Sequence, residues 1–347
     1  AMEDSSGIDL HQFRRWYTQA GTPVLNISGR YHADKNQYSL KIEQSCPDTP
    51  GQNRKLPFYI PFRMGLLDKF GAELPLKLKG EKGSASFDKV LTLSQEVQHF
   101  YFLDVPEPPV PSLLRSFSAP VRLNFDYSRE DLHFLMIHDT DGFNRWNASQ
   151  LLASDIIDEL QKCAGDDFTM ALPQILIDAY SGVLNSALES KTLDKAMIAQ
   201  VLTLPAEGLL IDQAEIADID SIHSVREFIT NMLANNLEAS FEEIFKANSI
   251  NKTFEVDAES IAQRALKNLA LAYLVRTDKD SWIKDCYRQF EDATNMTDQL
   301  AALRCLVGSD SELGVDAATR ALQVFYEKWK HEPLVVDQWF IVQASCQ

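Results

Sequence analysis

The chain has 347 residues, a formal net charge of −17 and an apolar content of 45%. A domain usually holds roughly 100–200 residues, so this length predicts two domains, and the apolar content excludes an intrinsically disordered chain. The acidity argues against nucleic acid and anionic membrane surfaces as partners.

The excess negative charge is confined to the second part of the chain. Residues 1–127 carry 15 Lys and Arg against 14 Asp and Glu, whereas residues 128–347 carry 18 against 36. Two interpretations are open. The acidic surface attracts cationic ligands such as peptide amino termini, or it only keeps a large helical surface soluble.

Cysteine usage and hydropathy indicate the compartment. The five cysteines are odd in number and lack a C-x-x-C spacing, which predicts reduced thiols in a cytoplasmic protein. Cys305 stands between Leu303 and Leu306, where we expect a buried, inert thiol. The longest apolar run, residues 269–275, is far shorter than the ~20 residues of a transmembrane helix, so no membrane span is expected.

The first predicted element is a helix over residues 9–21, within a leading helical segment of residues 1–22. Asp9 and Gln12 have the spacing of a capping box, and Gly21 suits the left-handed position that follows a helix. Pro23 then blocks continuation of the helix.

Residues 23–127 predict an Ig-like β-sandwich domain. Apolar and polar residues alternate, as in 37–43, where Tyr38, Leu40 and Ile42 share one face. About seven short strands without intervening helices are typical of an antiparallel sandwich. The predicted strands are 24–28, 37–43, 58–64, 74–78, 87–93, 97–103 and 121–127. The prolines between 106 and 111 predict a rigid extended connector or a covered sheet edge.

At Ser128 the apolar period becomes helical. Ser128 can cap a helix whose first turn holds Glu130 and Asp131. Residues 128–347 therefore predict an all-α superhelical domain, an irregular HEAT-like solenoid that is truncated at its C-terminus. The predicted helices are 129–138, 142–163, 171–189, 194–203, 212–218, 221–248, 257–276, 279–291, 298–307 and 314–330, with a last one from 333.

Local signals refine this helical prediction. Candidate helix caps are Asp194, Asp220, Asp257 and Thr297, and Gly308 is a candidate stop. The helix over 257–276 ends in residues that are apolar on every side, so it should lie in the inner layer.

The sequence offers no catalytic or metal-binding constellation. It contains no H-E-x-x-H, no G-x-S-x-G and no glycine-rich phosphate loop. His223 and Glu227 have the spacing of a helical pair, which predicts a surface contact rather than a metal site. We therefore assign no catalytic, cofactor-binding or metal-binding residue in this chain.

Several stretches nevertheless resemble the C-terminal part of the zinc aminopeptidase N family, the bacterial alanyl aminopeptidases of the gluzincin class. They are residues 9–23, with the pattern DLHQFRRWYTQAGTP, then 117–121, 134–146, 264–268, the distinctive NMTDQLAAL of 295–303, and 337–344. These stretches follow one another in family order across essentially the whole chain.

The resemblance implies a fragment of a four-domain hydrolase. The zinc and its H-E-x-x-H motif belong to an upstream thermolysin-like domain, so the fragment itself would hold no cofactor and would not be an enzyme. Its sandwich and helical domains would brace that catalytic domain, close over its active site and limit the access of short peptides. The implied partners are thus the upstream catalytic and N-terminal domains of the same protein.

Four matched residues are candidates to face the substrate chamber: Arg264, Asn268, Asn295 and Asp298. Asn295 and Asp298 have the alternative role of fixing a turn and a helix start. Arg264 flanks an apolar helix, so it either pairs with a core carboxylate or points into the chamber. A stand-alone Ig-plus-solenoid scaffold that binds a protein partner is the alternative function.

Overall fold

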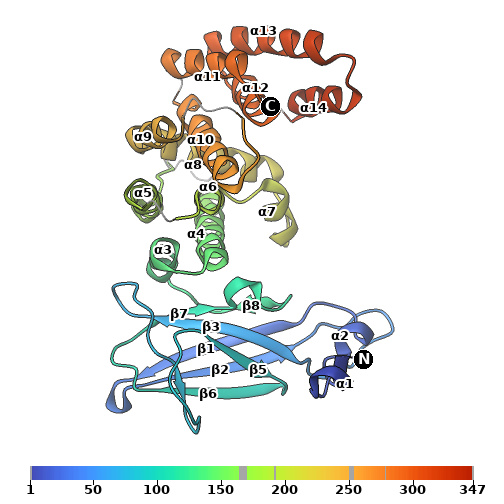
Figure 1. Cartoon of the computed structure of the whole chain (residues 1–347), viewed down its shortest axis with the longest axis vertical. Helices are drawn as coiled ribbons and strands as arrows, with labels where there is room; N and C mark the ends of the chain where they lie inside the picture. Colours follow the sequence, from blue (N-terminus) through green and yellow to red (C-terminus); the bar gives the residue numbers. More distant parts are fainter. Residues whose placement is uncertain (1, 164–169, 191–192, 250–253, 278, 346–347) are drawn as a thin grey trace. The chain divides into compact units, whose positions relative to one another are not determined.

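The computed structural model describes residues 2–163, 170–190, 193–249, 254–277 and 279–345 (Figure 1). The chain forms two compact units, residues 1–148 and 149–347, so the division falls inside a helix. No helix in the described parts combines the length and the apolar character needed to cross a bilayer.

The first unit contains an Ig-like β-sandwich of two sheets, as the sequence predicted. One sheet has the strand order β4-β6-β2-β1-β8 and the other has the order β5-β3-β7. The strands are β1 Val24–His32, β2 Gln37–Ser45, β3 Ile60–Leu67, β4 Lys77–Leu78, β5 Lys89–Leu93, β6 Val97–Leu103, β7 Val110–Leu113 and β8 Arg122–Asn124.

The core of the sandwich follows from the predicted alternation. Tyr38, Leu40 and Ile42 of β2 are buried in one apolar cluster with Phe62 and Met64 of β3, so both sheets contribute. Burying side chains of this size stabilises the fold by roughly 1.5–3 kcal/mol each.

Two features of the sheets differ from the prediction. The sequence did not predict β7, in which Pro111 lies opposite Leu66 of β3. Because β7 is an edge strand, the missing amide hydrogen of Pro111 costs no ladder bond, while the other three prolines precede the strand. In addition, β8 pairs with β1 in parallel, so the sandwich is not wholly antiparallel.

The predicted helix over residues 9–21 is wrong for most of its length. Within it only α2 Arg15–Thr18 is an α-helix, and a separate short helix, α1 Met2–Ser6, precedes it. The Gln12 side chain does not cap a helix, because its amide nitrogen donates to the carbonyl oxygens of Pro57 at 3.0 Å and Ser94 at 2.7 Å. Contacts to the sandwich thus replace the local capping box.

From Ser128 onward the chain is helical, and Ser128 and Asp131 form a reciprocal capping box at the start of the first helix. The helices are α3 Arg129–His138, α4 Gly142–Cys163, α5 Gln174–Glu189, α6 Lys195–Val201, α7 Glu207–Gln213, α8 Ile219–Asn236, α9 Glu238–Asn248, α10 Ala258–Val275, α11 Asp280–Asp292, α12 Met296–Val307, α13 Glu312–Trp329 and α14 Pro333–Ala344.

Most helix boundaries agree with the sequence, and three predictions fail. The predicted helix over 221–248 is two helices, because α8 ends at Asn236 and α9 begins at Glu238, with Leu237 between them. The helix predicted over 212–218 lies earlier, as α7. The caps of α8 and α12 are Asp218 and Asn295 rather than Asp220 and Thr297, since these side chains accept the free amides of the first turn.

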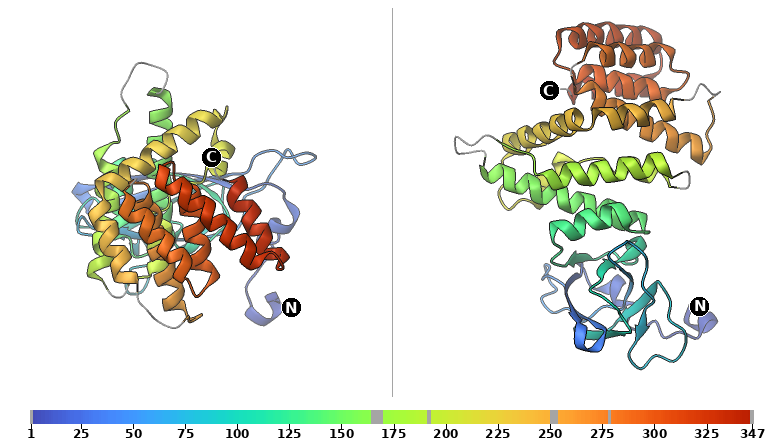
Figure 2. Two further views of the ribbon diagram at one scale, coloured as in Figure 1. Left: turned by 90° about the horizontal axis from the view of Figure 1, so that it is seen from above. Right: turned by 90° about the vertical axis from the view of Figure 1, so that its left-hand side faces the viewer.

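Successive helices of the second unit stack as antiparallel neighbours, the ARM-like arrangement that the sequence predicted (Figure 2). Helix α10 lies in the inner layer, as predicted, because it packs against α6, α8, α9, α11 and α12. Its buried residues include Leu266, Leu271 and Leu274. Polar side chains of α10 can therefore contact residues of several neighbouring helices.

Candidate functional site

The four residues that the sequence nominated lie together where α10, α11 and α12 meet. Asp298, in the first turn of α12, is the centre of the group. Its carboxylate accepts hydrogen bonds from Asn268 of α10 at 2.9 Å and from the Asn295 amide at 3.1 Å, and it pairs with the Lys267 ammonium at 2.7 Å. We call Asp298 and its partners Lys267, Asn268, Gln289 and Asn295 the Asp298 cluster.

Hydrogen bonds from the third helix complete the Asp298 cluster. The Gln289 amide, on α11, donates to the Asn268 side chain at 2.9 Å and to the Asp298 carbonyl at 3.2 Å. Both carboxylate oxygens of Asp298 and the amide oxygen of Asn268 thereby accept hydrogen bonds, as buried polar groups require. The cluster joins three helices, so its members can hold neighbouring side chains in fixed positions.

Burial and hydrogen bonding shift the pKa of Asp298 in opposite directions. Burial is the largest influence and favours the neutral acid, but the bonds from Lys267, Asn295 and Asn268 together outweigh it. The pKa of the Asp298 carboxyl is consequently held below its usual value. Asp298 is therefore an anion that neutralises Lys267, and it is poorly suited to act as a general base.

A hollow of about 320 Å³ opens beside the Asp298 cluster. Arg264 lines this hollow, and its guanidinium carbon lies 4.9 Å from the centroid of the Phe254 ring, which is a cation–π contact. Arg288 lines it as well and pairs with Asp285 at 2.7 Å. The hollow can thus receive a polar ligand, yet among the described residues that line it no serine, cysteine or histidine is positioned as an activated nucleophile.

Sequence reasoning missed Lys267 and Gln289. A signal for Lys267 was present, because Arg264, Lys267 and Asn268 recur at i, i+3 and i+4 and so share one face of α10. Gln289 belongs to another helix, and only the packing of α11 against α10 and α12 brings it to Asn268. The predicted contact between His223 and Glu227 is wrong: His223 pairs with Glu207 at 2.8 Å, and Glu227 pairs with Arg276.

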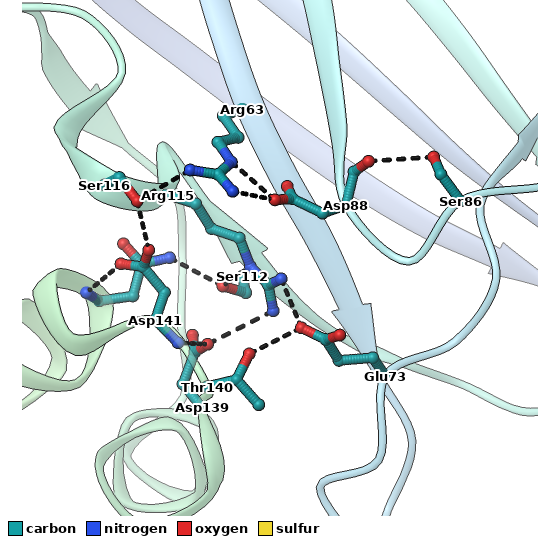
Figure 3. A network of polar contacts seen from close by, with 11 residues as sticks. Arg63, Glu73, Ser86, Asp88, Ser112, Arg115, Ser116, Asp139, Thr140 and Asp141 are labelled. Carbon is teal, nitrogen blue, oxygen red and sulfur yellow. Dashed lines mark hydrogen bonds and ion pairs between the residues drawn. The ribbon is translucent and has the colours of Figure 1, made fainter. Parts of the chain in front are cut away.

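The first unit holds a second polar group that the sequence did not indicate (Figure 3). Arg115 is almost fully buried, and its guanidinium contacts Glu73 at 2.6 Å, Asp139 at 3.4 Å and the Ser112 hydroxyl at 2.8 Å. Ser112 also accepts a hydrogen bond from Asn144 at 2.8 Å. Arg115 thereby ties β7 and the turn after β3 to the start of the helical region.

Backbone strain accompanies the placement of Arg115. Leu114, Ser116 and Phe117 have φ values of 58°, 54° and 47°, which non-glycine residues rarely adopt. Gly65 leaves the space that the guanidinium fills, since a Cβ there would lie 2.4 Å from Cζ of Arg115. A strained backbone segment persists only where the surrounding contacts hold it in place, and the contacts of Arg115 do so here.

The donor set for a zinc ion is missing from the parts of the chain that the structure describes. No group of three or more His, Cys, Asp or Glu side chains there is arranged to hold a metal ion. Catalytic zinc needs three protein ligands. The described residues therefore do not fit a zinc site.

Comparison with known proteins gives two family matches and several relatives. A domain of unknown function with an Ig-like fold (DUF3458) matches residues 21–126, and one with ARM repeats (DUF3458_C) matches residues 129–347. The chain is 37% identical to aminopeptidase N of Escherichia coli (strain K12) over 345 residues, and 34% identical to aminopeptidase N of Haemophilus influenzae over 346 residues. Each alignment covers 99% of this chain and 38% of the relative.

A solved structure agrees with these matches. Aminopeptidase A of Legionella pneumophila, crystallised in complex with aspartic acid, superposes with a TM-score of 0.80 at 33% identity. The superposition covers 100% of this chain and 38% of that one. The chain thus spans well under half the length of the relatives that it matches.

Proposed function

This chain belongs to the aminopeptidase N family and corresponds to the C-terminal part of its members, and we propose that it is the non-catalytic portion of a zinc aminopeptidase. Such an enzyme removes amino-terminal residues from short peptides. The single observation that carries the proposal is the extent of the match: nearly all of this chain aligns with little more than a third of each relative. In the proposal, zinc and the catalytic residues belong to upstream domains of the same cytoplasmic protein.

The two units have different tasks in this proposal. The sandwich braces the catalytic domain, and the helical unit covers the active site and limits which peptides enter. Two features of the helical unit support the second task. Its surface carries the whole excess of negative charge, which attracts cationic peptide amino termini. Members of the Asp298 cluster line the hollow beside Arg264, which lies over the ring of Phe254 and forms no ion pair with a carboxylate of the described residues.

The first test compares this chain with the protein encoded by the complete reading frame. We expect the chain alone to bind no stoichiometric zinc and to leave alanyl-anilide substrates intact, whereas the complete protein binds zinc and hydrolyses them. Separately expressed upstream sequence should gain activity when this chain is added. Turnover by the chain alone would mean that the chain holds an active site of its own and would contradict the proposal. A reading frame that begins here without a zinc motif upstream would favour the scaffold alternative.

The second test concerns access of peptides. In the complete enzyme, Arg264→Ala is expected to change KM for tetrapeptides by about tenfold, equivalent to one charge-assisted hydrogen bond, while kcat for an alanyl anilide stays the same. The matched control is Arg320→Ala, since Arg320 also lies over an aromatic ring, 5.2 Å from Tyr287, and is exposed outside the hollow. Equal effects of the two substitutions would contradict a role for the hollow.

A further inference from the structure

A second cavity of the helical unit has a volume of about 710 Å³, which lies within the range of small-molecule sites. Three arginines line it: Arg226 of α8, Arg276 directly after α10, and Arg304 in the last turn of α12. Helix α10 packs against both α8 and α12. Three neighbouring helical segments thus each contribute one guanidinium group to the lining of one cavity.

The carboxylates of the lining compensate only one of these arginines. The two terminal nitrogens of Arg276 contact the two carboxylate oxygens of Glu227, one of them at 3.3 Å, so this pair is bidentate. Glu207 pairs with Nδ1 of His223 at 2.8 Å. Asp310 is exposed, beyond the end of α12. These contacts leave Arg226 and Arg304 without a carboxylate partner among the described residues.

Arg226 is the more unusual of the two. It is half-buried, and its Nε donates to the carbonyl oxygen of Pro205 at 2.9 Å. Its terminal nitrogens have no hydrogen-bond or ion-pair partner in the described parts of the chain. Arg226 lies in the middle of α8, so the attraction of a helix C-terminus for cations does not explain its position. A guanidinium that is partly withdrawn from water is stabilised by a bound counter-anion.

Arg304 makes the same cavity accessible from solvent. It is exposed, and its Nη2 reaches only the side-chain oxygen of Gln338, at 3.4 Å. Cys305 beside it is half-buried rather than buried, as the sequence had predicted, so the end of α12 lies at the edge of the core. A cation in the last turn of a helix also offsets the helix dipole, but that effect leaves the donors of Arg304 free to bind a ligand.

We propose that this cavity binds a small organic anion, whose carboxylate or phosphate group is recognised by Arg226 and Arg304. A guanidinium group presents paired N–H donors that match two oxygens of either anion. The cavity is large enough to hold the rest of such a molecule. Because the two arginines belong to α8 and α12, the bound anion stabilises the helical unit. The site requires neither zinc nor peptide hydrolysis, so it goes beyond the proposed function.

Isothermal titration calorimetry of the folded 347-residue chain tests the proposal, with inorganic phosphate and succinate as probes at an ionic strength fixed with chloride. Two charge-assisted contacts correspond to a dissociation constant of about 1 mM, which we expect for at least one probe. Tighter binding of phosphate indicates a phosphorylated ligand, and tighter binding of succinate indicates a carboxylate ligand. Dissociation constants above about 10 mM for both probes would overturn the proposal.

Diffuse attraction does not imitate this result, because residues 128–347 carry 18 Lys and Arg against 36 Asp and Glu and therefore repel anions elsewhere. Hydrogen exchange followed by mass spectrometry locates the bound probe. Exchange should slow in α8 and in the last turn of α12, and should stay unchanged in α5. Slower exchange confined to other helices would place the anion elsewhere and contradict the proposed site.

Three alanine variants separate this site from a general effect of charge. Arg226→Ala and Arg304→Ala should each weaken binding of the probe at least about tenfold, the loss of one charge-assisted contact. Arg320→Ala removes the same charge from an exposed position of α13 outside the cavity, so its dissociation constant should stay within about twofold.

Circular dichroism shows which variants are folded. Because Arg304 is exposed, Arg304→Ala keeps the fold and decides the outcome even if Arg226→Ala, which loses the bond to Pro205, unfolds. Unchanged affinity in Arg304→Ala, or equal weakening by Arg304→Ala and Arg320→Ala, would overturn the proposal.

Discussion

Replacing Arg115 with alanine should lower the free energy of unfolding of the first unit by about 3–5 kcal/mol, the cost of leaving a buried carboxylate without its cation. The group left behind is Asp139, whose side chain is fully buried. Burial raises the pKa of Asp139, and the loss of Arg115 should raise it further. A raised pKa in the folded state means that stability is lost as the pH increases through that pKa, so the deficit should grow toward neutral pH.

Hydrogen exchange followed by mass spectrometry can measure this loss of stability, because it reports the protection of the backbone amides of β3 and β7 separately from that of the helices of the second unit. Arg63→Ala is the matched control. Arg63 belongs to the same network and bonds Asp88 at 2.6 Å, but its side chain is 42% exposed, so its loss should cost about 1 kcal/mol or less. Similar losses at both arginines would refute the special role of the buried one.

Gly65 offers an independent check on the same contact. In the unchanged chain, Gly65→Ala should cost about 1–3 kcal/mol, because the new methyl group displaces the Arg115 guanidinium. In the Arg115→Ala background the space is empty, so the same substitution should cost less than about 1 kcal/mol. Additive effects of the two substitutions would contradict the contact.

Asp298→Asn should destabilise the second unit by about 3 kcal/mol at neutral pH, because it leaves the largely buried Lys267 without a counter-charge. The asparagine keeps the shape of the side chain and an oxygen for its neighbours, so the charge is the main change. Urea unfolding, together with hydrogen exchange of the first turn of α12, provides the measurement.

The effect of Asp298→Asn should also depend on pH. The folded-state pKa of Asp298 is lowered, so its contribution is fully present above the unfolded pKa and is lost as the pH falls through the folded pKa. The difference in free energy of unfolding between the Asp298→Asn variant and the unchanged chain should therefore become smaller at acid pH. Asp257→Asn is the control. Asp257 caps α10 by accepting a hydrogen bond from the Ser260 amide at 2.9 Å, and asparagine caps helices equally well. The free energy of unfolding of this variant should therefore stay within about 0.5 kcal/mol of that of the unchanged chain. A difference that stayed constant with pH would contradict the ion pair.

The sequence by itself determined the features that depend on residues close together in the chain. A helix cap depends only on neighbouring residues, so Ser128, with Glu130 and Asp131 in the first turn, marked the start of the first long helix correctly. The alternation in β2 and the apolar end of α10 likewise predicted a sandwich face and an inner helix. The same locality explains the family resemblance, because its motifs are short runs of neighbouring residues.

Only the tertiary structure decided which distant side chains become partners. Arg115 and Asp139 are 24 positions apart, and Lys267 and Asp298 are 31 apart, so no helical or strand period relates them. The local signal at Asp9 and Gln12 failed because the sandwich offered Gln12 better acceptors than the helix start did. Propensity and capping contribute about 1 kcal/mol each, whereas packing and buried charge contribute several, so the long-range contacts prevail wherever the two conflict.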